Sequence, residues 1–238
     1  MPLVSLLQEL RNFDTALLAN TIDHIDPTPA HTFYLSRSIQ SVTPSLGPTV
    51  GVAATCELDS STPAGEAEVE GYWSQLEEIS RMKEPAVWVV KTVGSRPDHE
   101  CVLGDGMAKT LYAAGCVGVV TDGGVRDVNG LLTTSFAAYC NGTTIHHCAL
   151  RFRNIGQPVE LGGVTIRTGD ILHANSEGVI RIPESCLEVL PVKAIQMLTF
   201  ENEAHSFLRK TDVPISEKRR HLMDLLGKYG FATYDFAK

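Results

Sequence analysis

The stretch that decides the fold lies mid-chain, where PAVWVVK (residues 85–91) is followed by GDGMAKTLYAAG (residues 104–115) and VGVVT (residues 117–121). The first and third segments are short apolar runs rich in valine, which is typical of strands buried on both faces of a sheet. The middle segment begins with two glycines and continues as a helix, which Gly115 is placed to cap at its C-terminus. Strands that alternate with a helix predict an α/β core.

Elements on either side of this stretch follow from hydrophobic periodicity. Apolar residues at helical spacing predict an N-terminal helix over residues 3–13, a short one over 15–25 and a longer one over 66–82. A β-branched run over 49–55 predicts another strand, and three short strands over 164–167, 171–174 and 179–182 predict a β-meander that Pro183 ends. We therefore expect a single domain over residues 1–238, with a core at about 47–183 and helical ends at 1–25 and 184–238.

The composition argues against several classes of binding partner and structural site. The 238 residues are 43% hydrophobic and 20% charged, and the net charge of −8 provides no basic field for nucleic acid or an anionic membrane. Six scattered cysteines without a Cys-x-x-Cys pair indicate neither a zinc site nor a disulfide framework. The N-terminus lacks the basic region of a signal peptide, and no apolar run is long enough to cross a bilayer. We expect a cytoplasmic protein that binds no nucleic acid and no membrane.

Charged residues bracket the central helix and the strand after it. Twenty residues separate Asp105 from the Arg126-Asp127 pair, and the helix and strand between them could bring the two acidic loops together. Two carboxylates suit a hard divalent cation, and an adjacent arginine suits a carboxylate or enolate oxygen. The pattern predicts a metal-assisted enzyme acting on a small anionic substrate. The alternatives are that each aspartate caps a helix and that Arg126 makes only a structural ion pair.

Three segments carry a resemblance to a known family: residues 104–127, GGVTIRTGD (162–170) and EGVIRIP (177–183). Together they resemble the RraA-like family, which contains the class II 4-hydroxy-4-methyl-2-oxoglutarate / 4-carboxy-4-hydroxy-2-oxoadipate aldolases. An aspartate followed after twenty residues by Arg-Asp marks the aldolase branch, and Asp105, Arg126 and Asp127 satisfy it. The resemblance implies a compact β/β/α swivelling fold of the phosphohistidine-domain type. It also implies homotrimers or homohexamers with active sites between subunits.

The resemblance further implies roles for the motif residues. Asp127 would ligate Mg²⁺ or Mn²⁺, Asp105 would hold the ion through a water, and Arg126 would contact the keto or enolate oxygen of the substrate. The pyruvyl carboxylate would lie on the backbone amides of the loop formed by Gly104, Asp105, Gly106 and Met107. The implied reaction cleaves a 4-hydroxy-2-oxo di- or tricarboxylic acid to pyruvate through a metal-stabilised enolate. Oxaloacetate decarboxylation would use the same enolate.

Departures from the family pattern bear on the substrate. Residues 174–178 read ANSEG where the family often has Ala-Asp-x-Asp-Gly, and Gly106-Met107 replaces a common aliphatic pair. A related lyase or decarboxylase acting on another 2-oxo acid therefore stays open. A non-enzymatic regulator that binds a ribonuclease or helicase is the other alternative, although regulators tend to lack the first acid, which is present here as Asp105.

Histidines outside the motif are expected to be structural. His146-His147-Cys148 contains metal-ligand residue types, but neighbours in a strand point to opposite faces, so a strand or loop role is expected. His173 is predicted to be a hydrogen-bonded histidine within a strand. The motif shows no base for the C4 hydroxyl proton of the substrate, and a water on the metal is the interpretation that the sequence allows.

Overall fold

The computed structural model describes residues 2–63 and 65–231. Within them, the main sheet has the strand order β1-β7-β5-β3-β2-β11-β12, and β8 pairs with the far end of β2. Its strands are β1 (Gln40–Ser41), β2 (Thr49–Asp59), β3 (Ala86–Thr92), β5 (Cys116–Thr121), β7 (Ala137–Cys140), β8 (Arg151–Arg153), β11 (Ile171–Asn175) and β12 (Gly178–Ile182). Four central strands, β2, β3, β5 and β7, are mutually parallel. This arrangement confirms the predicted α/β core.

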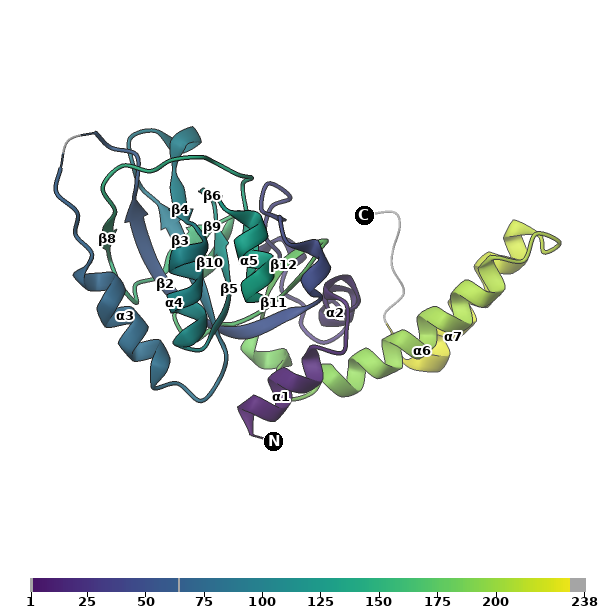
Figure 1. Cartoon of the computed structure of the whole chain (residues 1–238). Coiled ribbons are helices and arrows are strands. Elements are labelled where there is room, and N and C mark those ends of the chain that lie inside the picture. Colours follow the sequence, from purple (N-terminus) through teal and green to yellow (C-terminus); the bar gives the residue numbers. More distant parts are fainter. Residues whose placement is uncertain (1, 64, 232–238) are drawn as a thin grey trace.

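Two small sheets, seven α-helices and four short 3-10 helices make up the other regular elements of the described chain. The small sheets pair β4 (Cys101–Leu103) with β6 (Gly124–Val125) and β9 (Val159–Leu161) with β10 (Val164–Ile166). The helices are α1 (Leu3–Leu10), α2 (Thr15–Ile22), α3 (Glu70–Ser80), α4 (Asp105–Ala113), α5 (Val128–Thr134), α6 (Leu190–Leu208) and α7 (Ile215–Tyr229). Helices α3, α4 and α5 lie together on one side of the sheet (Figure 1).

The alternation of side chains along β3 shows why the molecule forms three layers. Trp88 and Val90 belong to the apolar cluster shared with α3 and α4, whereas Val87 and Val89 belong to the cluster shared with β9 and β10. Successive residues of a strand point to opposite faces, so a strand that is apolar throughout needs cover on both sides. The result is a β/β/α sandwich, as the resemblance implies.

Two predicted elements are corrected by long-range pairing. The helix expected over 66–82 begins only at Glu70, because the backbone of Glu68 is hydrogen-bonded instead to Leu150 and to Phe152 of β8. The expected meander is also wrong in its first strand, because β10 pairs with β9 and only β11 and β12 form a hairpin in the main sheet.

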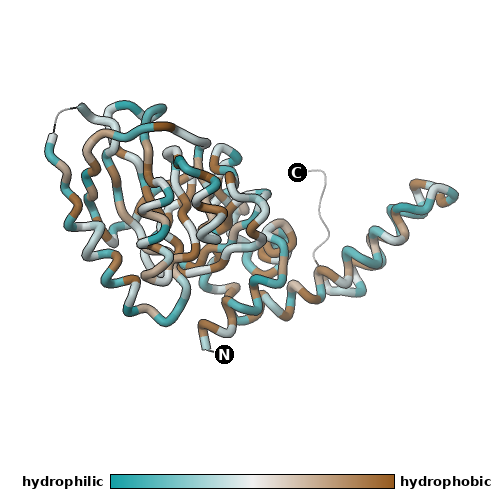
Figure 2. The backbone as a smooth tube through the Cα atoms, in the orientation of Figure 1, coloured by the Kyte–Doolittle hydropathy of each residue, from teal (hydrophilic) through white to brown (hydrophobic). Residues whose placement is uncertain are grey.

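The helical ends of the chain form a separate apolar cluster and an arm. Helices α1 and α2 pack with the base of α6 against the start of β2, β11 and β12. Beyond this base α6 and α7 run side by side away from the sheet (Figure 1). Apolar residues fill the interior of the sandwich, while the arm shows hydrophilic and hydrophobic residues interspersed (Figure 2). Within the described residues, no helix is both long and apolar enough to cross a membrane.

Candidate active site

The two acidic loops meet because the strands that precede them are paired. β4 and β6 run parallel, with Leu103 opposite Val125, and the Arg126 amide donates a hydrogen bond to the Leu103 carbonyl at 3.0 Å. The residues that follow two parallel paired strands leave the sheet at the same edge. Asp105 and the Arg126-Asp127 pair are therefore brought to one place, as the spacing predicts.

Glycines allow the loops to approach more closely than any other residue would. A Cβ atom added to Gly104 would lie 2.5 Å from Asp127 Oδ2 and 2.9 Å from Arg126 Nε. A Cβ atom added to Gly130, on α5, would lie 2.4 Å from the Cβ of Asp105. The backbone of the Gly104 loop thus touches the charged side chains of the second loop, and α5 is packed directly against Asp105.

Asp127 occupies a left-handed backbone conformation, with φ 58° and ψ 41°, at the position immediately before α5. Few residue types other than glycine tolerate this region, and aspartate is one of them. Asp127 is the N-cap residue of α5, but its side chain makes no capping hydrogen bond. At α4 the N-cap residue is Gly104, and Asp105 is the first residue of the helix. Capping therefore does not account for the Asp127 carboxylate.

Arg126 has a buried donor available for a ligand. Its Nε lies 3.5 Å from Asp127 Oδ2. Within the described part of the chain this buried nitrogen has no hydrogen-bond partner, although the side chain as a whole remains about one third exposed (36%). A buried donor that makes no hydrogen bond is unfavourable by about 1–3 kcal/mol, so an oxygen acceptor within hydrogen-bond distance would be stabilised.

Asp105 is held by a residue of its own helix. Lys109 Nζ donates to Asp105 Oδ2 at 2.6 Å, one helical turn away. This hydrogen bond, with the lysine charge and the more distant Arg126, lowers the pKa of Asp105 below its usual range. Lys109 lies within α4, and its ammonium group favours the ionised form of the first acid of the motif.

These groups share one cavity of about 370 Å³. Both loops of the motif line it, together with the end of β4 and the loop over residues 141–150. The lining comprises Val102, Leu103, Gly104, Asp105, Gly106, Met107, Arg126, Asp127, His147 and Leu150. All the residues that the sequence singled out as site residues are in this set. The volume falls within the range typical of small-molecule sites.

His147 is the polar residue of this cavity that sequence reasoning missed. The strand argument does not apply to it, because residues 141–150 form a loop. The side-chain Nδ1 lies 2.6 Å from the carbonyl oxygen of Cys148. The histidine pair in the sequence was the available signal, but no local periodicity places it beside a motif twenty residues away.

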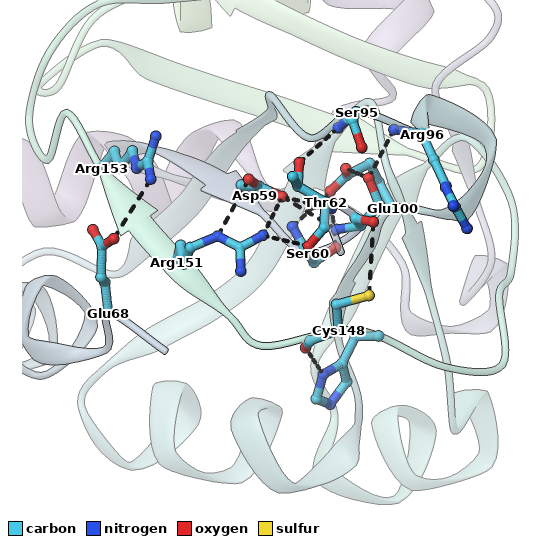
Figure 3. Close-up of polar contacts among 12 residues, drawn as sticks. Asp59, Ser60, Thr62, Glu68, Ser95, Arg96, Glu100, Cys148, Arg151 and Arg153 are labelled. Atoms are coloured by element: carbon cyan, nitrogen blue, oxygen red, sulfur yellow. Dashed lines mark hydrogen bonds and ion pairs between the residues drawn. The ribbon is translucent and has the colours of Figure 1, made fainter. Parts of the chain in front are cut away.

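A buried polar network anchors the His147 loop to the sheet (Figure 3). The Cys148 amide donates to the Ser60 carbonyl at 2.8 Å, and the amide and hydroxyl of Ser60 both donate to the Glu100 carboxylate, at 3.0 and 2.8 Å. Ser60 Oγ also accepts a bond from the amide of Cys101, the first residue of β4. The strand that leads to Gly104 and the loop that carries His147 are therefore fixed by the same residues.

Comparison with known proteins places the chain in a family. The family model described as RraA-like, Aldolase/RraA, matches residues 18–181. The chain belongs to the RraA-like family. A relative from Halalkalibacterium halodurans, provisionally named a 4-hydroxy-4-methyl-2-oxoglutarate aldolase, is 40% identical over 90 residues, which are 37% of this chain and 41% of that protein. The match thus spans less than half of that relative's length.

Solved structures show the same fold at lower identity. A protein of unassigned function from Pseudomonas syringae pv. tomato DC3000 is 21% identical, with a TM-score of 0.69 over 91% of this chain and 93% of its own. RraAS2 of Streptomyces coelicolor, described as an unusual member of the RNase ES inhibitor RraA protein family, is 23% identical, with a TM-score of 0.67 over 84% and 96%. At these identities the likeness concerns the fold alone.

Proposed function

We propose that this chain is a divalent-metal-dependent aldolase that cleaves a 4-hydroxy-2-oxo di- or tricarboxylic acid and releases pyruvate. The observation that carries the proposal is the buried Nε of Arg126, which makes no hydrogen bond among the described residues and lies beside Asp127 and the Gly104 loop at a cavity of suitable size. The provisional aldolase names of several relatives support the same reaction class.

The N-terminus of α4 is suited to hold the carboxylate of the substrate. The first amides of a helix have no intrahelical acceptor, and the helix dipole favours an anion there. Gly104 and Gly106 place little bulk between this backbone and a ligand. We assign the 2-oxo carboxylate to the amides of Gly104, Asp105, Gly106 and Met107.

The acidic residues fit a hard divalent cation that relies on water and substrate for most of its coordination. Among the described residues no group of three or more His, Cys, Asp or Glu side chains could hold a metal ion. Mg²⁺ commonly binds through only one or two carboxylates, with waters and substrate oxygens completing its shell. We assign Asp127 as the direct ligand of Mg²⁺ or Mn²⁺ and Asp105 as the residue that holds the ion through water.

Arg126 would stabilise the charge that develops during cleavage. When bound, the cation would act as a Lewis acid on the 2-keto oxygen. Breaking the C3–C4 bond leaves a pyruvate enolate, whose oxygen the guanidinium of Arg126 would meet as a preorganised donor. Oxaloacetate decarboxylation produces the same enolate, so we propose it as a second activity of the site.

We also infer a homo-oligomer, a trimer or hexamer with sites between subunits. Apolar side chains remain exposed along the arm at a spacing of three residues, with Val192 61%, Ile195 53% and Leu198 44% exposed. Trp73 on α3 is likewise 51% exposed. Large exposed apolar groups of this kind favour a protein interface.

An assay of 2-oxo acids tests the proposal. The protein is stripped of metal, then supplied with Mg²⁺ or Mn²⁺ and a panel of 4-hydroxy-2-oxo acids and oxaloacetate, with pyruvate detected enzymatically. We expect pyruvate release that requires the cation and stops with excess EDTA. Full turnover after verified metal removal would contradict the metal mechanism. Pyruvate release from none of the acids would favour the regulator alternative, and release from oxaloacetate alone would indicate a related decarboxylase.

A further inference from the structure

The geometry points to His147 as the base that removes the C4 hydroxyl proton during aldol cleavage. This inference rests on the proposed function and supplies a residue that the Asp-Arg-Asp motif leaves out. It replaces the water on the metal that the sequence alone suggested.

The hydrogen bond made by the ring determines its neutral tautomer. Nδ1 of His147 lies 2.6 Å from the carbonyl oxygen of Cys148, and a carbonyl only accepts hydrogen bonds. Nδ1 therefore carries the hydrogen, and Nε2 of the neutral ring has a free lone pair. In the described part of the chain no group donates a hydrogen bond to Nε2.

The backbone of the loop that carries the ring is tied to neighbouring elements on both sides of His147. Upstream, the amide of Thr144 donates to the carbonyl of Val125, one residue before Arg126, at 2.9 Å. Downstream, the amide of Cys148 is bonded to Ser60, which the buried Glu100 holds in place. A basic side chain held over a cavity by such contacts is well suited to proton transfer.

The proposed step balances in protons and electrons. Nε2 of His147 takes the proton of the C4 hydroxyl, and the electrons of that O–H bond form the new carbonyl at C4. The C3–C4 bond breaks, and its electron pair becomes the enolate of pyruvate. A water then protonates C3, and the imidazolium returns its proton to solvent.

A comparison of aldol cleavage with oxaloacetate decarboxylation distinguishes a role of His147 as a base from a purely structural role. Aldol cleavage needs a base for the hydroxyl proton, whereas decarboxylation of oxaloacetate starts from an ionised carboxylate and needs none. We expect His147→Gln to lower kcat for aldol cleavage by about 10²–10⁴-fold, the usual contribution of a general base, and to leave the decarboxylation rate unchanged. Its neighbour His146, whose ring centre is 5.8 Å from that of His147, provides the matched control His146→Gln, which should leave both rates unchanged.

Chemical rescue gives a second measurement. Added imidazole should restore aldol cleavage to His147→Ala in proportion to its concentration, without effect on decarboxylation. Equal losses in both reactions, or no loss in either, would overturn the role of His147 while the wild type remained active. If the wild-type protein were inactive in both reactions, the proposed function would be contradicted, and so would the role of His147.

Discussion

At the scale of single residues, two glycines determine how closely the charged groups of the site approach one another. Gly104 leaves room for the side chains of Arg126 and Asp127, and Gly130 leaves room for Asp105. Their importance lies in the absence of a Cβ atom, because neither glycine has a positive φ. The chemistry assigned to the site then depends on Arg126, whose buried Nε faces the same crowded junction.

Replacing Arg126 with lysine should lower activity although the positive charge remains. Lysine lacks the planar fork that meets two oxygens at once, and loss of a donor at a reacting oxygen lowers rates by about 10²–10³-fold. We expect parallel losses in aldol cleavage and oxaloacetate decarboxylation, measured beside the melting temperature. The exposed Arg153 supplies the control Arg153→Lys. A normal rate with a lowered melting temperature would show that Arg126 is only structural.

At the scale of elements, the end of β2 and the strand β8 are joined by a buried ion pair. Arg151 and Asp59 are 92 positions apart in the sequence. Their Nη2 and Oδ1 atoms lie 3.0 Å apart, and their side chains are only 5% and 8% exposed. Burial alone would raise the pKa of Asp59, but hydrogen bonds from Thr62, Arg151 and Ser61 together lower it. The pair closes the loop next to Ser60 and therefore supports the anchor of the His147 loop.

Removing the cation of this pair should destabilise the fold. Arg151→Met leaves the Asp59 carboxylate buried without a counter-charge, which lowers the free energy of unfolding by about 3–5 kcal/mol. On the same strand, Arg153 is half exposed and lies 3.5 Å from Glu68. Arg153→Met should therefore change stability by no more than about 1 kcal/mol. Urea unfolding of both variants tests the difference, and equal losses would contradict it.

His173 joins the N-terminal helices to β11, and it confirms the predicted structural role. Its Nε2 donates to the Leu10 carbonyl at 3.1 Å, and its Nδ1 accepts from the Thr15 hydroxyl at 2.9 Å. Burial lowers its pKa from 6.5 to about 4. As the pH falls through 6.5 the unfolded chain binds a proton that the folded protein takes up only near pH 4. Stability contributed by His173 is therefore complete above pH 6.5 and is lost on acidification.

We expect this loss to reach about 3 kcal/mol between pH 6.5 and 4, from the linkage between proton binding and folding. His173→Gln removes the titrating ring, so its unfolding free energy should decline less over this interval, even from a lower starting value. The exposed His146→Gln should follow the wild-type curve. Parallel curves for His173→Gln and the wild type would show that another group causes the pH dependence.

At the scale of the whole molecule, the arm formed by α6 and α7 leaves apolar side chains without cover. One face of its first turns is buried against α1, α2 and the sheet, whereas Val192 and Ile195 in the same turns remain more than half exposed. A helix that extends beyond its own domain provides a surface on which identical subunits can meet. The assembly inferred for this protein is therefore expected to depend on the arm.

Ile195→Glu should weaken or abolish that assembly. A carboxylate at the centre of an apolar interface loses its hydration without gaining a partner, which is strongly unfavourable. Light scattering should give a multiple of 25.8 kDa for the wild type and a smaller species for the variant. Thr165→Glu, at an exposed position of β10, is the control and should assemble normally. A fully active wild type at the monomer mass would contradict the homo-oligomer.

The sequence by itself determined the α/β core and identified the residues of the acidic motif. Valine-rich segments such as residues 86–90 require cover on both faces, and this is a local property that periodicity reveals. Gly115 adopts φ 103° after α4, as a C-terminal cap should. The buried, hydrogen-bonded state of His173 also followed from its place in an apolar strand.

Only the tertiary structure decided which distant segments meet. The pairing of β4 with β6, the ion pair between Asp59 and Arg151 and the position of His147 all depend on contacts between residues far apart in the chain. Local patterns carry no information on such contacts, because register and loop path are set by the packing of the whole sandwich. For the same reason Glu68 joins β8 instead of the helix that its own neighbourhood favours.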